Sequence, residues 1–222
     1  MLHKTKGVVL HTIKYGDSSI IAHIYTRDFG RQSYMVQGVR NRKSKFHFNN
    51  FQPLSLLDLE VDHKTTREIQ RIRDLQISHP FHHIQTNIHK NTIALFIGEL
   101  LYRSLHDVES NYALFDYVES AIQILDLCKQ GCVNFHLVFL IQFTRFLGIF
   151  PQNSQELDRY QPADIPLKLH DIIPVSLNEP GVLNLTNKER AALVEAMVDY
   201  YYYHLEGMGK ISSLKILKEI FS

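Results

Sequence analysis

Residues 6–37 read KGVVLHTIKYGDSSIIAHIYTRDFGRQSYMVQ, and this stretch decides the fold of the first part of the chain. Its segments are rich in β-branched and aromatic residues and are separated by Gly, Asp and Ser, a pattern typical of short strands joined by tight turns. We therefore predict strands over Lys6–Ile13, Ser19–Thr26 and Arg31–Gln37.

Two further strands are predicted downstream. The first is LSLLDLEV, which follows Pro53. The second, Arg67–Ile77, is ambiguous because its apolar residues fit both a helical period and an alternating one; we interpret it as a strand. Five short strands with polar connections are compatible with a small Greek-key barrel, of which the oligonucleotide-binding (OB) fold is the commonest five-stranded case. Residues 1–78 are accordingly predicted to form an OB-fold nucleic-acid-binding domain.

Beyond residue 78 the apolar residues recur with a helical period, which predicts an α-helical domain over residues 79–222. Three helices are expected near 93–105, 114–125 and 135–146, and the third is apolar on nearly all sides, which places it in the centre of a bundle. The predicted fold class is therefore α+β, with a barrel domain followed by a helical one.

The later part of the helical domain contains an irregular segment, residues 151–186. Prolines 162, 166 and 174 and the lack of a helical period predict a loop with short extended pieces. Thr186 and Glu189 then form a capping box that starts a helix running through the Tyr200–Tyr203 run, and a short helix is expected at Leu214–Phe221.

Composition narrows the class of protein. The 222 residues are 45% hydrophobic and 21% charged, as in folded globular proteins. Two cysteines exclude a disulfide-rich secreted scaffold and a four-cysteine zinc site. The most apolar stretch, 133–150, is broken by His136, Gln142 and Arg145, so no membrane span is expected. We expect a soluble, intracellular chain.

Charge is distributed unevenly along the chain. The whole chain has a formal net charge of +1, but residues 1–50 hold nine cations against Asp17 and Asp28, or 9 − 2 = +7. Such a field attracts a polyanion, and phosphate backbones are the commonest polyanion in a cell. The predicted nucleic-acid-binding cations are Lys4, Lys6, Lys14, Arg27, Arg31, Arg40, Arg42, Lys43 and Lys45.

Aromatic rings beside these cations are candidates for stacking on bases. Phe46 and Phe48 flank the basic loop and are the better candidates, whereas Tyr25 and Tyr34 lie in predicted strands, where tyrosines are more often core. Nothing in the chain is typical of a base-reading recognition helix, so binding is expected to be largely indifferent to nucleic-acid sequence.

Two other functions stay open at this point. A metal-dependent nuclease could use the histidines 79, 82, 83 and 89 with scattered carboxylates, and an RNA-binding accessory protein could use the same barrel. No standard zinc spacing, nucleophile elbow or phosphate-binding loop is found, so neither catalytic nor metal-binding residues are assigned. RNA binding would show itself as a preference for RNA over DNA.

Some other residues receive structural interpretations. Cys128 and Cys132 are interpreted as two buried small residues rather than a redox pair. The carboxylates 107, 109, 116 and 119 are interpreted as solvated groups on exposed helix faces. The lysines 210, 215 and 218 could extend a DNA track, receive an acidic tail, or be ordinary helix-end lysines.

The opening KTKGVVLHTIKYGDSSIIAHIYTRDFGRQSYMVQGVR resembles the start of the RecO family of bacterial recombination mediators. FQPLSLLDLEV resembles the family's fourth strand, LQISHPF its exit from the barrel, and RFLGIFPQNSQELDRY the end of its helical bundle. The resemblance implies an OB barrel, a helical domain, binding to single- and double-stranded DNA, and annealing of complementary strands.

The resemblance also implies partners and a location. It implies work with RecR in loading recombinase onto strands coated by single-strand DNA-binding protein (SSB), whose acidic tail would dock on the helical domain. The place of work would be the bacterial cytoplasm, at the nucleoid. Many members carry a four-cysteine zinc motif after the Leu-Asp-Arg segment; this chain has Tyr160 there and no cysteine up to Pro180, so no cofactor is expected. Packing of Ile165, Leu167, Ile172 and Ile173 is the expected substitute.

Overall fold

The computed structural model describes residues 2–39, 45–105 and 109–221, which form two compact units. The first unit comprises Met1–Phe81 and Ile97–Ile122, and the second comprises His82–Phe96 and Gln123–Ser222. Helices α1 (Ile88–Ser104) and α2 (Tyr112–Leu127) therefore contribute residues to both units.

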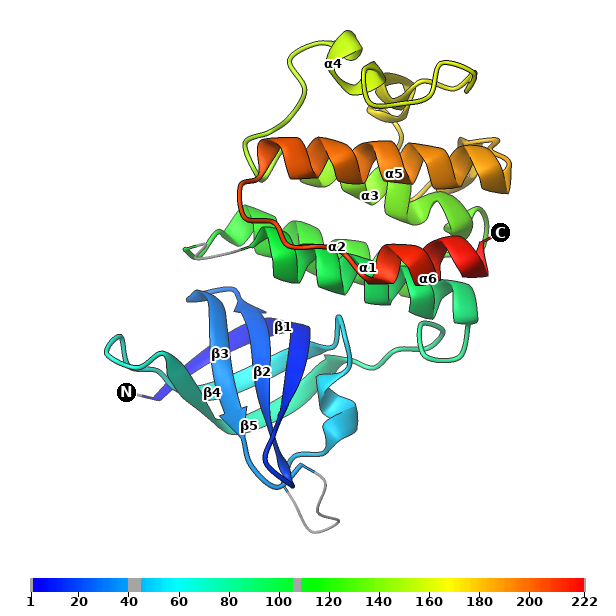
Figure 1. The fold of residues 1–222 in the computed structure, drawn as a ribbon. Coiled ribbons are helices and arrows are strands. Elements are labelled where there is room, and N and C mark those ends of the chain that lie inside the picture. The colour runs from blue at the N-terminus through cyan, green and yellow to red at the C-terminus, as the bar shows by residue number, and fades with distance from the viewer. Residues whose placement is uncertain (1, 40–44, 106–108, 222) are drawn as a thin grey trace. The chain divides into compact units, whose positions relative to one another are not determined.

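The first unit contains a closed five-stranded barrel with the strand order β1-β2-β3-β5-β4 (Figure 1). Its strands are β1 (Leu2–Tyr15), β2 (Ser19–Thr26), β3 (Gly30–Val36), β4 (Leu56–Asp62) and β5 (Ile69–His79). This confirms the predicted OB-type barrel followed by helices, and it resolves the ambiguous stretch 67–77 as a strand.

The barrel closes because β1 is long enough to serve two neighbours. Its residues 2–8 pair with β4 and its residues 7–15 pair with β2, with an irregularity between Val9 and His11. Strands β3 and β5 close the other side in parallel, from Ser33 opposite Ile69 to Met35 opposite Arg71. Because β1 pairs with β4 along its first half and with β2 along its second half, it joins the two ends of the sheet and leaves no open edge there.

Apolar side chains from all five strands fill the barrel. Tyr34 lies in this core and Tyr25 is equally buried, as predicted for tyrosines in strands. Gly7 is required where the walls come close, since a Cβ at this position would lie 2.7 Å from Ile24 Cγ2 and 2.8 Å from Leu59 Cδ1.

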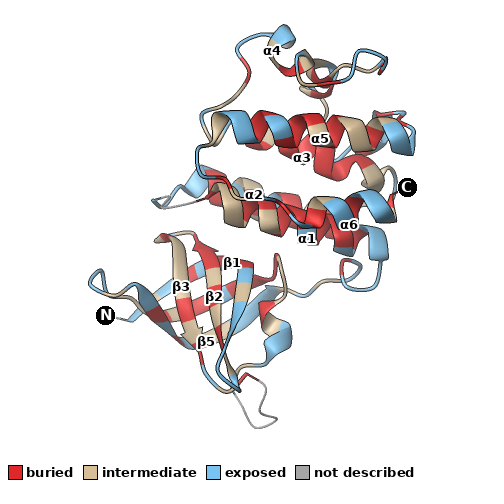
Figure 2. Ribbon diagram, viewed as in Figure 1, coloured by how far each residue is buried: buried red, intermediate tan, exposed pale blue. Residues whose placement is uncertain are grey.

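The second unit is built around α3 (Phe135–Phe143), which is buried at every position except Gln142 (Figure 2). The prediction of a central buried helix is confirmed. Helix α5 (Asn187–His204) packs on it, and the Tyr201 hydroxyl donates a hydrogen bond to the Leu140 carbonyl at 2.7 Å. The predicted capping box of Thr186 and Glu189 starts α5, and α6 (Ser213–Ile220) is the last helix.

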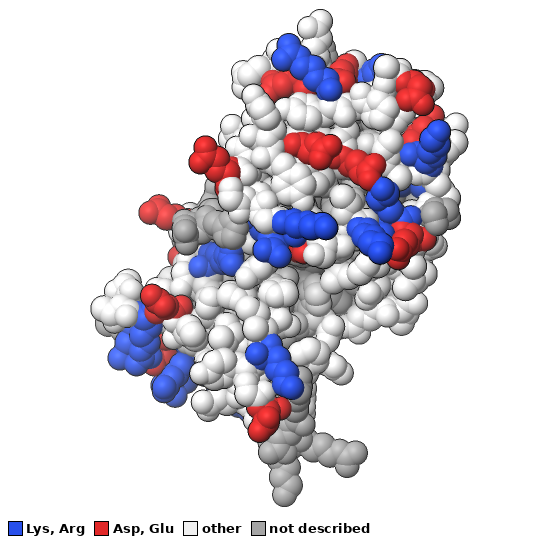
Figure 3. All heavy atoms as spheres, viewed as in Figure 1, with Lys and Arg blue, Asp and Glu red and all other residues white. Residues whose placement is uncertain are grey.

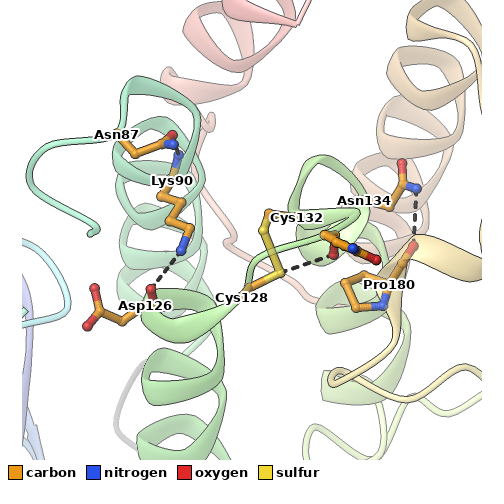
Figure 4. The surroundings of a disulfide bond; sticks show 8 residues. Asn87, Lys90, Asp126, Cys128, Cys132, Asn134 and Pro180 are labelled. Carbon is orange, nitrogen blue, oxygen red and sulfur yellow. Dashed lines mark hydrogen bonds between the residues drawn. A yellow bond between two sulfur atoms is a disulfide. The ribbon is translucent and has the colours of Figure 1, made fainter. Parts of the chain in front are cut away.

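A buried carboxylate organises the beginning of the second unit. Asp126, at 0% exposure, accepts hydrogen bonds from the backbone N–H groups of His82, His83 and Ile84 at 2.9, 2.8 and 2.9 Å. The Lys90 ammonium donates to the Asp126 carbonyl at 2.6 Å, as Figure 4 shows. These contacts satisfy backbone donors that have no helical partner.

The two cysteines form a disulfide between Cys128 and Cys132, at the turn that joins α2 to α3 (Figure 4). Both residues are partly exposed, so the interpretation as two buried thiols is wrong. Their Cα atoms are 5.9 Å apart, and a separation of four residues in a tight turn brings the two side chains together. A C-x3-C spacing alone carries little sign of this.

Next to the disulfide, the chain makes a close backbone crossing. Gly131 has φ of +65°, and a Cβ there would lie 2.1 Å from Gly181 Cα. Asn134 fixes the crossing, because its side-chain amide donates to the carbonyls of Pro180 and Leu183 at 3.2 and 2.8 Å. The same side chain accepts from Arg190 Nε at 2.7 Å.

The irregular segment contains short helical turns instead of the predicted extended pieces. Helix α4 (Ser154–Asp158) begins because Asn153 caps the backbone N–H of Glu156, and a 3-10 turn covers Leu169–Ile172. Of the expected packing residues, Ile165 and Ile172 are buried, while Leu167 and Ile173 are partly exposed. Buried Gln161 links the segment internally through Leu167 O and Leu169 N.

Candidate nucleic-acid interface

Two of the predicted cations face carboxylates of α2 within the first unit. Lys6 Nζ lies 2.8 Å from Glu119 Oε1. The Arg27 guanidinium makes two parallel contacts with Asp116, Nε to Oδ1 at 3.1 Å and Nη2 to Oδ2 at 3.3 Å. Asp116 is exposed, as interpreted, whereas the interpretation of Glu119 as a solvated group is wrong because its side chain is only 17% exposed. Both carboxylates contact cations of the barrel.

A third predicted cation, Arg31, has a structural role. Its Nη1 donates to the carbonyls of Tyr102 and Leu105 at 3.0 and 3.2 Å, and its guanidinium lies over the Tyr102 ring at 4.3 Å. Burial and the nearby Arg31 charge lower the pKa of His23 to about 4. Arg31 thus donates hydrogen bonds to two carbonyls at the end of α1, where backbone carbonyls have no helical partner.

The described end of the basic loop lies against β5. Lys45 contacts Asp74 at 3.2 Å and donates to the Arg73 carbonyl at 2.9 Å, and the hydrogen bond from Lys45 lowers the pKa of the Asp74 carboxyl. Phe46 packs against the barrel core, whereas Phe48 is 40% exposed. Phe48 is therefore the better placed of the two rings for stacking. Arg40, Arg42 and Lys43 lie outside the described residues.

Lys4 and Lys14 are the remaining predicted cations. Both are exposed on β1, and neither forms an ion pair with another residue of the described ranges. Lys4 lies, with Lys6 and Arg27, on the wall of a surface cavity of about 470 Å³. The same cavity is lined by four carboxylates: Asp28, Asp58, Glu60 and Asp74.

Among the described residues, the predicted cations therefore do not form one uninterrupted basic surface. On the face drawn in Figure 3, Lys and Arg groups lie beside Asp and Glu groups. The surplus of +7 over residues 1–50 overstates the local field, because many of the charges that balance it lie on β4, β5 and α2. Charges close in space act together whatever their separation along the chain.

The barrel carries further basic residues outside residues 1–50, which the sequence prediction did not include. Lys64, Arg67, Arg71 and Arg73 lie on β5 and on the turn that precedes it. Arg67 and Arg73 both contact Asp62, at 3.4 and 3.3 Å, whereas Arg71 is exposed. The sequence KTTREIQRIR carries the signal, with four cations against Glu68.

The described residues contain neither a cluster of metal-ligating side chains nor a membrane-spanning helix. Within residues 2–39, 45–105 and 109–221, no three His, Cys, Asp or Glu side chains gather as metal ligands would. In the same described ranges, no helix is long and apolar enough to cross a membrane.

Family models match both the barrel region and the helical region of the chain. A family model described as "Recombination protein O N terminal" matches residues 1–81, and one described as "Recombination protein O C terminal" matches residues 85–171. The chain belongs to the RecO family. The first matched region contains the barrel and its exit, and the second contains α1 to α4 and ends before α5.

Curated relatives of this RecO-family chain match it from end to end. The chain is 34% identical over 241 residues to the "DNA repair protein RecO" of Phocaeicola vulgatus, with both chains covered completely. It is 35% identical over 236 residues to the protein of the same name from Flavobacterium psychrophilum, with 99% of each chain covered. It is 34% identical to that of Bacteroides fragilis.

Proposed function

We propose that this RecO-family chain is a DNA-binding mediator of repair and recombination that carries out no bond chemistry. It binds single- and double-stranded DNA largely without sequence preference and promotes annealing of complementary strands. The observation that carries this proposal is the closed OB-type barrel with exposed cations on β1 and β5, in a chain whose full-length relatives are named as DNA repair proteins.

The proposed interface combines the predicted residues with those found on β5. Lys4, Lys14 and Arg71 are exposed and open to phosphates, and Phe48 is open to a base. Arg40, Arg42 and Lys43 are proposed as further phosphate-binding residues. Phosphate contacts of this kind give affinity and position without reading bases, which supports binding that tolerates any sequence.

The proposed partners are RecR and SSB, and the proposed location is the cytoplasm, at the nucleoid. With RecR, the chain would help to load recombinase onto strands coated by SSB. For the acidic SSB tail, we favour the cavity of about 460 Å³ lined by Lys210, Lys215, Lys218 and Leu214. Glu219 and Glu195 also line it and form ion pairs with Lys215 and Lys218, which the tail would have to displace. Titration of a labelled tail peptide tests this: K210Q/K215Q should weaken binding, and unchanged binding would reject this cavity.

DNA binding is tested by fluorescence anisotropy of a labelled single strand of about 30 nucleotides at several salt concentrations. If about five cations contact phosphates, log affinity should fall with log salt at a slope of roughly −3.5. Strands of different sequence should bind alike. No binding at low salt would contradict the proposal.

The same samples distinguish the other two functions. Incubation with Mg²⁺ or Mn²⁺ should leave the labelled strand intact, and metal-dependent cleavage would favour a nuclease. Titration with an RNA of equal length should give no tighter binding than DNA, and a clear preference for RNA would favour an RNA-binding role through 2′-hydroxyl contacts.

A further inference from the structure

Helix α2 presents a row of polar side chains to the barrel. Tyr112, Asp116 and Glu119 are spaced by four and three residues, so they lie on one face of the helix. All three contact the barrel: the Tyr112 hydroxyl is 3.4 Å from Asp28 Oδ1, Asp116 contacts Arg27, and Glu119 contacts Lys6. The α2 carboxylate pair, Asp116 and Glu119, therefore faces two predicted DNA-binding cations.

The Asp116 contact resembles the way in which a guanidinium binds a phosphate. Two parallel N–H donors of Arg27 meet the two carboxylate oxygens, which is the geometry that Arg uses for planar anions. The Tyr112 ring lies against the same guanidinium, 4.9 Å from its carbon to the ring centroid. Arg27 is thus held in the geometry in which it would bind a phosphate, but the bound anion is a carboxylate of the same chain.

These pairs are open to exchange. The side chains of Lys6, Arg27 and Asp116 are 47%, 42% and 54% exposed, and that of Glu119 is 17% exposed, so at least one partner of each pair is open to solvent. Exposed ion pairs are weak, because water and salt screen them. A nucleic acid offers many phosphates on one chain, so it can replace the two carboxylates at Lys6 and Arg27 by rotation of side chains.

We propose that the α2 carboxylate pair is an autoinhibitory contact that occupies Lys6 and Arg27 until a polyanion displaces it. The contact weakens binding to short or sparse anions and leaves these two cations available only where a long phosphate backbone competes. This inference rests on the proposed DNA-binding function and names how that interface is regulated.

The test removes the two negative charges and keeps the side chains' size. In D116N/E119Q, Lys6 and Arg27 are free to contact phosphates, so binding of a labelled single strand of about ten nucleotides, too short to displace the pair in the wild type, should tighten. Each added phosphate contact at 0.1 M salt is worth about fivefold, so the gain should approach about 25-fold, with the salt slope steeper by about 1.4. A matched control, D164N/E206Q, makes the same change in net charge on exposed residues of the second unit and should gain far less.

A second variant ties the gain to the two cations. Adding K6Q/R27Q to D116N/E119Q should return affinity and slope to near the wild-type values. The inference is overturned if D116N/E119Q binds like the wild type, or if the gain persists without Lys6 and Arg27. If neither wild type nor D116N/E119Q binds DNA, the proposed function fails and the inference with it; binding by the variant alone would support both.

Discussion

Asp116 and Asp126 lie on the same helix, yet their carboxylates differ in burial and in the groups that they contact. Asp116 belongs to the first unit, is 54% exposed and contacts a guanidinium at the surface. Asp126 belongs to the second unit, is fully buried and accepts three backbone hydrogen bonds. A buried polar group that is fully satisfied fixes the fold, whereas an exposed pair contributes little stability and can be exchanged for a ligand.

The largest expected effect is on Asp126. Asp126→Ala leaves three backbone N–H groups without acceptors in a buried site, so the free energy of unfolding should fall by about 3 to 5 kcal/mol. Urea denaturation measures this. Asp126→Asn keeps one acceptor oxygen and should lose less, and exposed Asp199→Ala should change little. Equal small losses in all three variants would show that Asp126 does not organise residues 82–84.

The next effect concerns His136, which is buried on α3 against Phe96 and Phe221. Burial, with a smaller effect of Arg190, lowers the pKa of this imidazole from 6.5 to about 3. As pH falls below 6.5 the unfolded chain therefore takes up a proton that the folded chain does not. Above pH 6.5 the imidazole is neutral in both states and does not change the free energy of unfolding. Between pH 6.5 and 3, protonation of the unfolded chain lowers the free energy of unfolding by about 1.4 kcal/mol for each pH unit.

His136→Leu removes that titration, so its unfolding free energy should depend less on pH between 6.5 and 4.5 than that of the wild type. The difference should approach 3 kcal/mol, or about 1.4 kcal/mol for each unit. Exposed His47→Gln serves as the control and should follow the wild-type curve. Parallel curves for the wild type and His136→Leu would mean that the buried imidazole is protonated in the fold.

The smallest effect is expected at the α2 carboxylate pair. D116N/E119Q should change the free energy of unfolding by no more than about 1 kcal/mol, because Lys6, Arg27 and Asp116 are exposed, so solvent screens both pairs even though Glu119 is only 17% exposed. Thermal or urea unfolding at two salt concentrations measures this. A loss as large as that of Asp126→Ala would show that these pairs hold the fold, which would contradict their role as exchangeable contacts.

Much of the architecture could be predicted because it depends on local patterns. The alternation of apolar residues and the positions of turn residues predict the strands. Thr186 and Glu189 predict the start of α5, since a capping box needs only nearby residues. The extent of the third helix was overestimated. It ends at Phe143, and Thr144 and the residues after it form tighter turns.

The candidate site was less predictable because its properties depend on distant residues. No local pattern shows that Glu119 meets Lys6, which lies more than a hundred residues earlier in the chain. Arg71 lies outside the basic residues 1–50. Phe46 and Phe48 look alike in sequence, although Phe46 is partly buried against the barrel core and Phe48 is 40% exposed. Charge counts thus identify a basic region, but contacts decide which charges are available.

The most direct test of this account compares two pairs of lysine and arginine residues on the barrel. The salt dependence of binding to a single strand of about ten nucleotides, which is too short to displace the α2 carboxylate pair, should be measured for K4Q/K14Q and for K6Q/R27Q. Removing the unpaired Lys4 and Lys14 should flatten the slope by about 1.4, whereas removing Lys6 and Arg27, already neutralised by α2, should flatten it much less. Equal flattening by both variants would contradict the claim that ion pairing within the chain decides which cations contact DNA.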